Sequence, residues 1–251
     1  MYYGKHVSIT GKEPYEEFNT IQIFTKGPQS MRNIQIKLET EGRRLFVHSP
    51  YPMVGIWSKN FNHLLKEELL KSDSLGSEGY VVHMKEMSEQ QLFEKLKAIE
   101  SLYMEHSINT KIFFENQASK SKSPEKRKFN SIKDMERLFM EIKEHFPLLK
   151  VGLCIDTAHL FSAGNFSLEE LEEYINTVGD DHPILIHFNG AYQKNMGTGK
   201  DQHVLPMSKE DAVWSKNNAR DFLEICSHKK IPLIVEVKQL SSGFKQFMSL
   251  F

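Results

Sequence analysis

The 251-residue chain lacks the features that mark several protein classes. Its two cysteines are too few for a disulfide framework, so we expect a packed core to hold the fold in a reducing compartment. The N-terminus has no basic stretch followed by an apolar run, which argues against a signal peptide. No apolar segment approaches the length of a membrane span. We therefore expect an intracellular protein of the cytoplasm or nucleus.

An excess of charge of one sign is also missing, as are several common catalytic motifs. The formal net charge of −1 argues weakly against a nucleic-acid partner. The chain has no GxSxG elbow, P-loop or dinucleotide fingerprint. It does have eleven histidines, which hint at metal sites, and a locally basic segment, SKSKSPEKRK, at 119–128. Each bound divalent ion would add two positive charges that a residue count omits.

Eight short apolar or alternating runs predict β-strands. They cover 2–9, 21–25, 45–50, 80–84, 111–116, 151–156, 183–189 and 231–237. Helical periodicity fills intervals such as 92–103 and 132–146, and Ser167 with Glu170 predicts a capping box. Strands that alternate with helices predict an α/β fold, a single-domain (β/α)8 TIM barrel over 1–251. An open doubly wound sheet is the alternative.

Six of these strands end in a residue that can bind a metal ion. These residues are His48, His83, Glu115, Asp156, His187 and Glu236. In a parallel barrel the carboxyl ends of all strands lie on one face, where the βα-loops build active sites. A single strand-end histidine is more often a core residue, but six such positions on one face favour a ligand cluster.

Three further candidates follow the strands. His159 lies three residues beyond Asp156, and Asp201 and His203 form a D-x-H pair whose side chains share one face of an extended segment. We expect Cys154 to point away from the face of Asp156, so no cysteine is counted as a ligand. Nine ligands exceed the needs of one zinc ion and favour two or three ions, with a carboxylate such as Glu115 as a bridge.

The ligand types suggest both the metal and the chemistry. Imidazole-rich, mixed nitrogen and oxygen coordination favours zinc, while manganese would suit some positions. Closely spaced ions are typical of phosphoester hydrolysis, because they stabilise the attacking and leaving oxygens together.

Several motifs lie in order along almost the whole chain. They are GKHVSITG (4–11), FTKGPQ (24–29), VHSPY (47–51), VVHM (81–84), FFENQA (113–118), LCIDTAHLFSAG (153–164), HFNGA (187–191), GTGKDQH (197–203) and LIVEV (233–237). With these motifs the chain resembles the endonuclease IV family of apurinic/apyrimidinic (AP) endonucleases, zinc-dependent TIM barrels that act on damaged DNA. All nine ligand types of the family's trinuclear site are present.

The resemblance implies how the ligands are divided among three zinc ions. His48, His83 and Glu115 would hold one ion; Glu115, Asp156, His187 and Glu236 the second; and His159, Asp201 and His203 the third.

The resemblance also implies the reaction. A metal-bound hydroxide, surrounded by the catalytic carboxylates Glu115, Asp156 and Glu236, would hydrolyse the phosphodiester on the 5′ side of an abasic site and leave a 3′-hydroxyl. Removal of 3′-blocking groups would use the same chemistry. The expected partner is double-stranded DNA with abasic sites or blocked 3′ ends, and the expected active unit is a monomer.

DNA contacts are predicted from loops on the same face. Lys26, Lys194 and Lys200, with Lys59 and the lysines of 120–128, would hold flanking phosphates, unless they are only solvated surface lysines. Tyr51 matches a family tyrosine that inserts near the damaged nucleotide; a loop tyrosine that caps the barrel mouth is the alternative.

One predicted DNA contact departs from the family pattern. Gln29 stands where the family usually has an arginine; it could bond a base, but without the arginine's charge and planar stacking. This departure affects the predicted distortion of DNA and the lesion preference, not the ligand set.

Two other functions remain open at this point. A sugar isomerase or epimerase of the xylose-isomerase-like type would use one or two divalent ions on the same face, without needing His159, Asp201 and His203. A metal-stabilised DNA-binding protein without catalysis is the other, and the complete ligand set argues against it.

Overall fold

Parallel strands close into a barrel in the computed structural model, which describes residues 3–6, 18–26, 41–50, 61–119, 126–178 and 182–237. The strands are β1 (Tyr3–His6), β2 (Thr20–Phe24), β3 (Arg44–His48), β4 (Gly79–His83), β5 (Lys111–Glu115), β6 (Val151–Asp156), β7 (Ile184–His187) and β10 (Leu233–Val235). β1 pairs with both β2 and β10, which closes the sheet. All eight predicted strands are present, and the closed barrel is confirmed over the open sheet.

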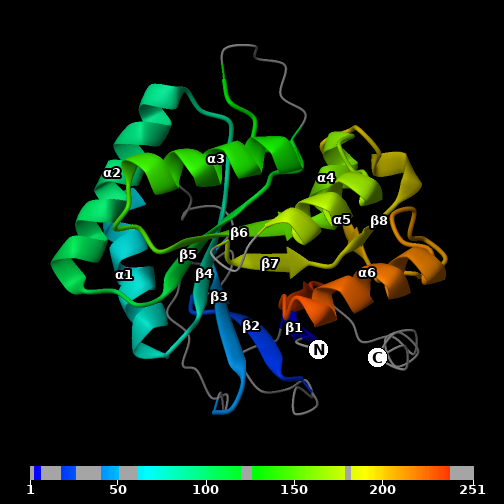
Figure 1. The fold of residues 1–251 in the computed structure, drawn as a ribbon, viewed down its shortest axis with the longest axis horizontal. Coiled ribbons are helices and arrows are strands. Elements are labelled where there is room, and N and C mark those ends of the chain that lie inside the picture. The colour runs from blue at the N-terminus through cyan, green and yellow to red at the C-terminus, as the bar shows by residue number, and fades with distance from the viewer. Residues whose placement is uncertain are drawn as a thin grey trace.

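The described helices lie outside the strands, at the left, top and right of the view in Figure 1. They are α1 (Phe61–Ser74), α2 (Glu89–His106), α3 (Ile132–His145), α4 (Thr157–Ala163), α5 (Leu168–Thr177) and α6 (Lys216–His228), with a short 3-10 helix η1 (Gln193–Asn195). The predicted periodic segments fall in α2 and α3. Ser167 accepts the backbone N–H of Glu170 at the start of α5, which is one half of the predicted capping box. Among the described residues, no helix is long and apolar enough to cross a membrane.

A small apolar cluster fills the inside of the barrel below its carboxyl end. It consists of Phe46, Val81, Phe113, Cys154, Leu185 and Ile234. Each of these residues stands two positions before one of the predicted strand-end ligands. Because residues two apart on a strand share a face, the strand-end side chains also point toward the barrel interior. The apolar cluster is therefore the floor on which the candidate site is built.

Cys154 belongs to this floor, so the prediction that it points away from the face of Asp156 was wrong. The side-chain period of a strand is two, which places residues 154 and 156 on the same face. The Cys154 side chain is fully buried, and this burial raises the pKa of its thiol. Cys154 is thus a neutral packing residue beneath the site.

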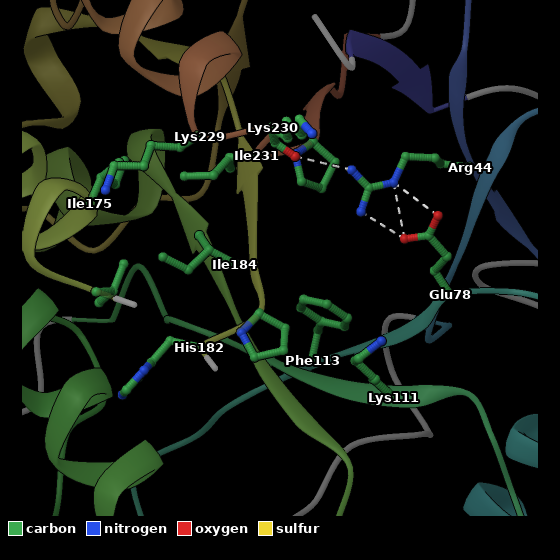
Figure 2. A pocket seen from close by; sticks show the side chains of 13 residues that line it. Arg44, Glu78, Lys111, Phe113, Ile175, His182, Ile184, Lys229, Lys230 and Ile231 are labelled. Carbon is green, nitrogen blue, oxygen red and sulfur yellow. Dashed lines mark hydrogen bonds and ion pairs between the residues drawn. The ribbon is translucent and has the colours of Figure 1, made fainter. Parts of the chain in front are cut away.

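The amino end of the barrel carries a cavity of about 160 Å³ (Figure 2). Arg44 and Lys111, the first residues of β3 and β5, line it. The Arg44 guanidinium donates to both carboxylate oxygens of Glu78 at 2.7–3.0 Å, as Figure 2 shows. This cavity lies at the opposite end of the strands from the predicted ligands.

The antiparallel pair β8 (Gly190–Ala191) and β9 (His203–Val204) lies outside the barrel strands. It follows β7 and brings the segment that contains the D-x-H pair back toward the carboxyl end of the barrel. The hairpin therefore supplies ligand candidates that no barrel strand carries.

Candidate metal centre

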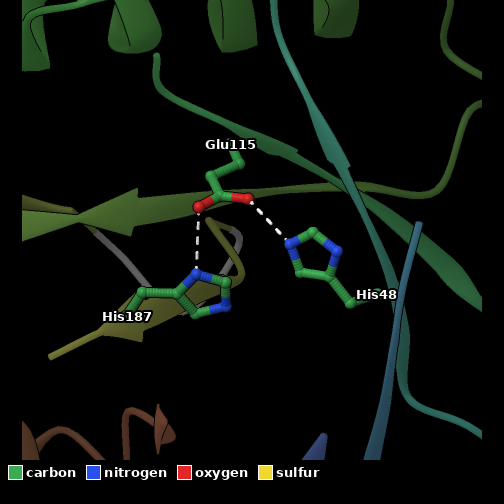
Figure 3. A group of neighbouring side chains, drawn as sticks. All are labelled: His48, Glu115 and His187. Carbon is green, nitrogen blue, oxygen red and sulfur yellow. Dashed lines mark hydrogen bonds and ion pairs between the residues drawn. The ribbon is translucent and has the colours of Figure 1, made fainter. Parts of the chain in front are cut away.

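Glu115 lies at the middle of the strand-end side chains and is fully buried. Its Oε2 is 3.2 Å from His48 Nε2 and 2.9 Å from His83 Nε2. Its Oε1 is 3.0 Å from His187 Nδ1. Figure 3 shows this carboxylate between the rings of His48 and His187. The two oxygens of Glu115 thus face different histidines, which is the arrangement that a bridging carboxylate requires. We call His48, His83 and Glu115 the first group.

A second set of ligand atoms lies around Oε1 of Glu115. The ligand atoms of Glu115, Asp156, His187 and Glu236 all lie within 4.8 Å of one another. His187 Nδ1 is 3.1 Å from Glu236 Oε2 and 3.8 Å from Asp156 Oδ2. These four residues, called the middle group, correspond to the second set that the family resemblance implies.

The third group joins the barrel to the hairpin. Asp201 Oδ1 lies 3.2 Å from His159 Nε2 and 3.0 Å from His203 Nε2. His203 Nε2 also lies 3.5 Å from Asp156 Oδ2, so Asp156 stands between the middle and third groups. Asp201 is the most open member, with 46% of its side chain exposed.

Asp156 serves both the local fold and the site. It ends β6 and is the N-cap of α4, where its Oδ1 accepts the backbone N–H of His159 at 2.8 Å. This bond fixes the first turn of α4 and leaves Oδ2 facing the cluster. The short helix ends at Gly164 with φ of +82°, a left-handed conformation that glycine adopts without steric cost. The segment from β6 to Gly164 therefore carries two ligand candidates, Asp156 beside the middle group and His159 in the third group.

Hydrogen bonds on the outer side of the rings orient two of the histidines. His48 Nδ1 is 2.7 Å from the carbonyl oxygen of Ser49, and His159 Nδ1 is 2.8 Å from that of Asn116. A carbonyl oxygen only accepts, so Nδ1 carries a hydrogen in each ring and Nε2 is the nitrogen that faces the cluster. Metal-binding histidines are usually held in this way.

Unpartnered ring nitrogens test whether these residues fit a metal ion. His159 Nε2 and His203 Nε2 are both buried and have no hydrogen-bond partner among the described residues. Both nitrogens lie close to Asp201 Oδ1 but without hydrogen-bond geometry. Buried polar atoms without partners are rare, and a bound cation would satisfy both nitrogens after displacing their protons. The donor set, rich in imidazole and carboxylate, fits zinc.

The protonation of the cluster follows from its buried carboxylates. Burial acts to raise the pKa of Glu115, but His83 and His187 hold that pKa well below its usual range. Burial acts to lower the pKa of His203, but Asp156 and Asp201 raise it to about 9. Without a metal, the cluster therefore balances carboxylates with protonated imidazoles. Divalent ions would take the place of those protons.

Four further side chains at the site were missed by the sequence analysis: His6, Gln22, Asn116 and Asn189. Asn189 donates from Nδ2 to Asp156 Oδ2 at 2.7 Å and accepts the backbone N–H of Glu236 at 2.9 Å. Asn116 pairs through its side chain with both backbone groups of Asp156. Asn116 follows Glu115 by one position and Asn189 follows His187 by two. A polar residue so close to a strand-end ligand candidate is the sequence pattern that indicates a supporting contact.

The predicted DNA-contacting residues occupy different positions. Lys26 is buried, and its Nζ lies 2.7 Å from Glu67 Oε2 and 3.6 Å from Glu68 Oε1, so carboxylates already balance its charge. Lys194 and Lys200 are exposed between β8 and β9, and Lys200 directly precedes Asp201.

Other predicted contacts cannot be placed on the structure. Gln29, Tyr51, Lys59 and residues 120–125 lie outside the described residues. Lys126 is described, and its Nζ lies 3.8 Å from Glu86 Oε1. The roles of all these residues in DNA binding stay predictions.

Comparisons with known proteins agree with this architecture. The model of the xylose isomerase-like TIM barrel family matches residues 9–214. A probable AP endonuclease of African swine fever virus is 28% identical over 247 residues, which cover 87% of this chain and 79% of the relative. A probable endonuclease 4 of Halothermothrix orenii is 27% identical over 238 residues, which cover 81% of this chain and 82% of the relative.

Solved structures share the barrel. Endonuclease IV from Thermus thermophilus has a TM-score of 0.73 and 21% identity, with 100% of this chain and 98% of that chain covered. A D-tagatose 3-epimerase-like protein has a TM-score of 0.64 and 18% identity, with 100% and 96% covered. At such identities these two likenesses establish the fold and do not distinguish nuclease from epimerase chemistry.

Proposed function

The chain belongs to the xylose isomerase-like TIM barrel family, and we propose that it is a DNA-repair AP endonuclease that hydrolyses the phosphodiester on the 5′ side of abasic sites. The names of its relatives, AP endonuclease and endonuclease 4, support this activity at the level of the family. The observation that carries the proposal is the third group. Asp201 and the unpartnered Nε2 atoms of His159 and His203 extend the site beyond what one or two ions need.

Zinc is the metal that we propose for all three groups. The first, middle and third groups would each hold one ion, with Glu115 shared between the first two. Zinc ions supply Lewis acidity, charge neutralisation at the phosphate and a lower pKa for water at neutral pH. Manganese would suit some of the positions.

The chain's own residues would hold and orient the substrate. The buried carboxylates of Glu115 and Asp156 and the half-buried carboxylate of Glu236 would fix the spacing of the groups, and the exposed Lys194 and Lys200 would bind flanking phosphates of double-stranded DNA. The product would carry a 3′-hydroxyl, and blocked 3′ ends would be cleaned at the same site. We further propose an intracellular, monomeric enzyme.

The decisive experiment combines metal analysis and cleavage on one sample of purified protein. We expect close to three zinc ions per chain and nicking of an abasic-site duplex without added magnesium, stopped by a strong chelator. A ketose offered as substrate should not be epimerised. Zinc-replete protein that leaves the abasic duplex intact, or that epimerises the sugar, would refute the proposal.

Substitution of Glu115 by glutamine tests the bridge. Glu115→Gln keeps the size of the side chain but replaces one oxygen that faces a histidine pair, so cleavage should fall by several orders of magnitude with the fold retained by circular dichroism. Glu105→Gln is a suitable control, because that side chain is 61% exposed and lies outside the site. Wild-type cleavage by Glu115→Gln would exclude Glu115 as a bridging ligand.

A further inference from the structure

We infer that Gln22 is a positioning residue for the middle group, which fixes the orientation of the His187 ring and of the Glu236 carboxylate. This inference rests on the proposed function, because it concerns the same metal centre. Gln22 is on β2, is fully buried and lies outside the nine predicted ligands. Its amide stands between two members of the middle group, His187 at the end of β7 and Glu236 directly after β10.

Three contacts define the position of the Gln22 amide. Its Nε2 is 2.7 Å from Glu236 Oε1 and 3.0 Å from His6 Nδ1. Its Oε1 is 2.9 Å from His187 Nε2. Each hydrogen of the amide nitrogen therefore has an acceptor available, and the amide oxygen has a donor available.

These contacts determine which nitrogen of His187 is free for a metal. A carboxylate only accepts, so the atom of Gln22 that faces Glu236 must be the nitrogen. The amide oxygen then faces His187, whose Nε2 must carry a hydrogen and donate it. The other nitrogen, Nδ1, lies 3.0 Å from Glu115 Oε1 and 3.1 Å from Glu236 Oε2, inside the middle group. Gln22 thus presents Nδ1 of His187 to the ion.

Two other histidines also have an acceptor for the ring nitrogen that points away from the cluster, but there the acceptor is a backbone group. Backbone carbonyls accept from the outer nitrogens of His48 and His159. At His187 the acceptor is a side chain, so this orienting contact can be removed by substitution. The partners of ligating histidines commonly contribute 10- to 100-fold, roughly, to metal affinity.

His6 completes the arrangement on β1. Its Nδ1 lies 3.0 Å from Gln22 Nε2 and 3.4 Å from Glu236 Oε1. In the tautomer with the hydrogen on Nε2, His6 Nδ1 accepts the second amide hydrogen of Gln22, which opposes rotation of the amide by a half turn. A rotated amide would place its oxygen against Glu236 Oε1 and its nitrogen against the donating Nε2 of His187. Both contacts would be repulsive, so the observed orientation of Gln22 is the one that the surrounding atoms allow.

The test compares zinc binding and the state of His187 in two variants and a control. Gln22→Met fills nearly the same volume without hydrogen-bonding nitrogen or oxygen; Gln22→Glu keeps an acceptor for His187 but repels Glu236. Thr20→Val on the same strand is the control, because Thr20 is buried two positions earlier and its hydroxyl bonds to Asn19, away from the middle group. Zinc affinity is measured by competition with a chromophoric chelator. Long-range ¹H–¹⁵N spectra of the zinc-loaded protein report the His187 nitrogens.

We expect one zinc ion to bind about 10- to 100-fold more weakly in Gln22→Met, with loss of the exchange-protected Nε2–H signal of His187. In Gln22→Glu the affinity should also fall while that signal remains, and Thr20→Val should match the wild type. Unchanged affinity in either Gln22 variant would overturn the inference while leaving the proposed function intact. Wild-type protein that takes up no zinc would overturn both.

Discussion

Replacement of Asp211 by asparagine should loosen the segment that supplies the third group. The Asp211 carboxylate accepts four backbone N–H groups around the β8–β9 hairpin. Its Oδ1 accepts from Ala191 at 3.2 Å and Val213 at 2.8 Å, and its Oδ2 accepts from Met207 at 2.8 Å and Trp214 at 3.2 Å. This one side chain therefore ties both ends of the segment that contains the D-x-H pair.

The size of the effect follows from the number of lost acceptors. An asparagine keeps one oxygen and turns an NH₂ group toward two of the four N–H donors. A buried N–H without an acceptor costs about 1–3 kcal/mol. Because Asp211 is half-buried, we take the lower part of this range and expect a loss of about 2–3 kcal/mol in the free energy of unfolding. The melting temperature should then fall by roughly 5–10 °C for a chain of this length.

Thermal and urea unfolding of the zinc-free proteins measures this loss, and zinc titration measures its effect on the site. Asp221→Asn on α6 is the control, since that side chain is 63% exposed and contacts the exposed Arg220; its stability should change by less than about 0.5 kcal/mol. Folded Asp211→Asn should also bind its third zinc more weakly than the wild type. If Asp211→Asn unfolds at the wild-type midpoint, the carboxylate does not organise this segment.

Four other outcomes can be checked with the same measurements of stability and zinc binding. Gly190→Ala would place a Cβ 2.5 Å from the Asp211 Cγ, so its melting temperature should fall about as far as that of Asp211→Asn; an unchanged value would mean that the carboxylate moves freely. Zinc loading at pH 7 should release protons into a weakly buffered indicator solution, because the pKa of His203 is about 9 and that of His159 is also raised; zinc uptake without proton release would contradict this charge balance. For the same reason the zinc-free protein should lose stability as the pH rises from about 6.5 to 9, since these rings stabilise the folded state fully only below their unfolded pKa. Asp201→Ala should lower the zinc content by about one ion per chain, and a content equal to that of the wild type would leave the D-x-H pair as a loop feature.

The barrel and its ligand face could be predicted from the sequence because one periodicity governs both. Short strands with inward residues at every second position place Phe113 in the floor and Glu115 above it, and the same step recurs on five other strands. The prediction for Cys154 was wrong because Cys154 and Asp156 are two positions apart on β6 and therefore share a face. Gln22 was missed because sequence patterns identify side chains that bind metals directly, and an amide that orients a histidine carries no such signal.

Other features depend on tertiary contacts that the sequence does not indicate. Lys26 looks like an exposed loop lysine in the sequence, yet the adjacent pair Glu67 and Glu68 on α1 neutralises it. The four N–H groups that donate to Asp211 come from positions between 191 and 214. No local sequence pattern predicts that they share one acceptor.

The structure of Asp156 links folding of the site to its ligand geometry. One oxygen of its carboxylate caps α4 and the other receives Asn189 Nδ2 at 2.7 Å beside the middle group. This side chain therefore serves the helix even before a metal binds, and its two hydrogen bonds hold the carboxylate in place without an ion. The same helix turn carries His159, whose Nδ1 is fixed by Asn116. Because these contacts orient the ligand candidates in advance, binding of the proposed zinc ions would spend little free energy on ordering them, and more of the binding free energy would stabilise the folded state.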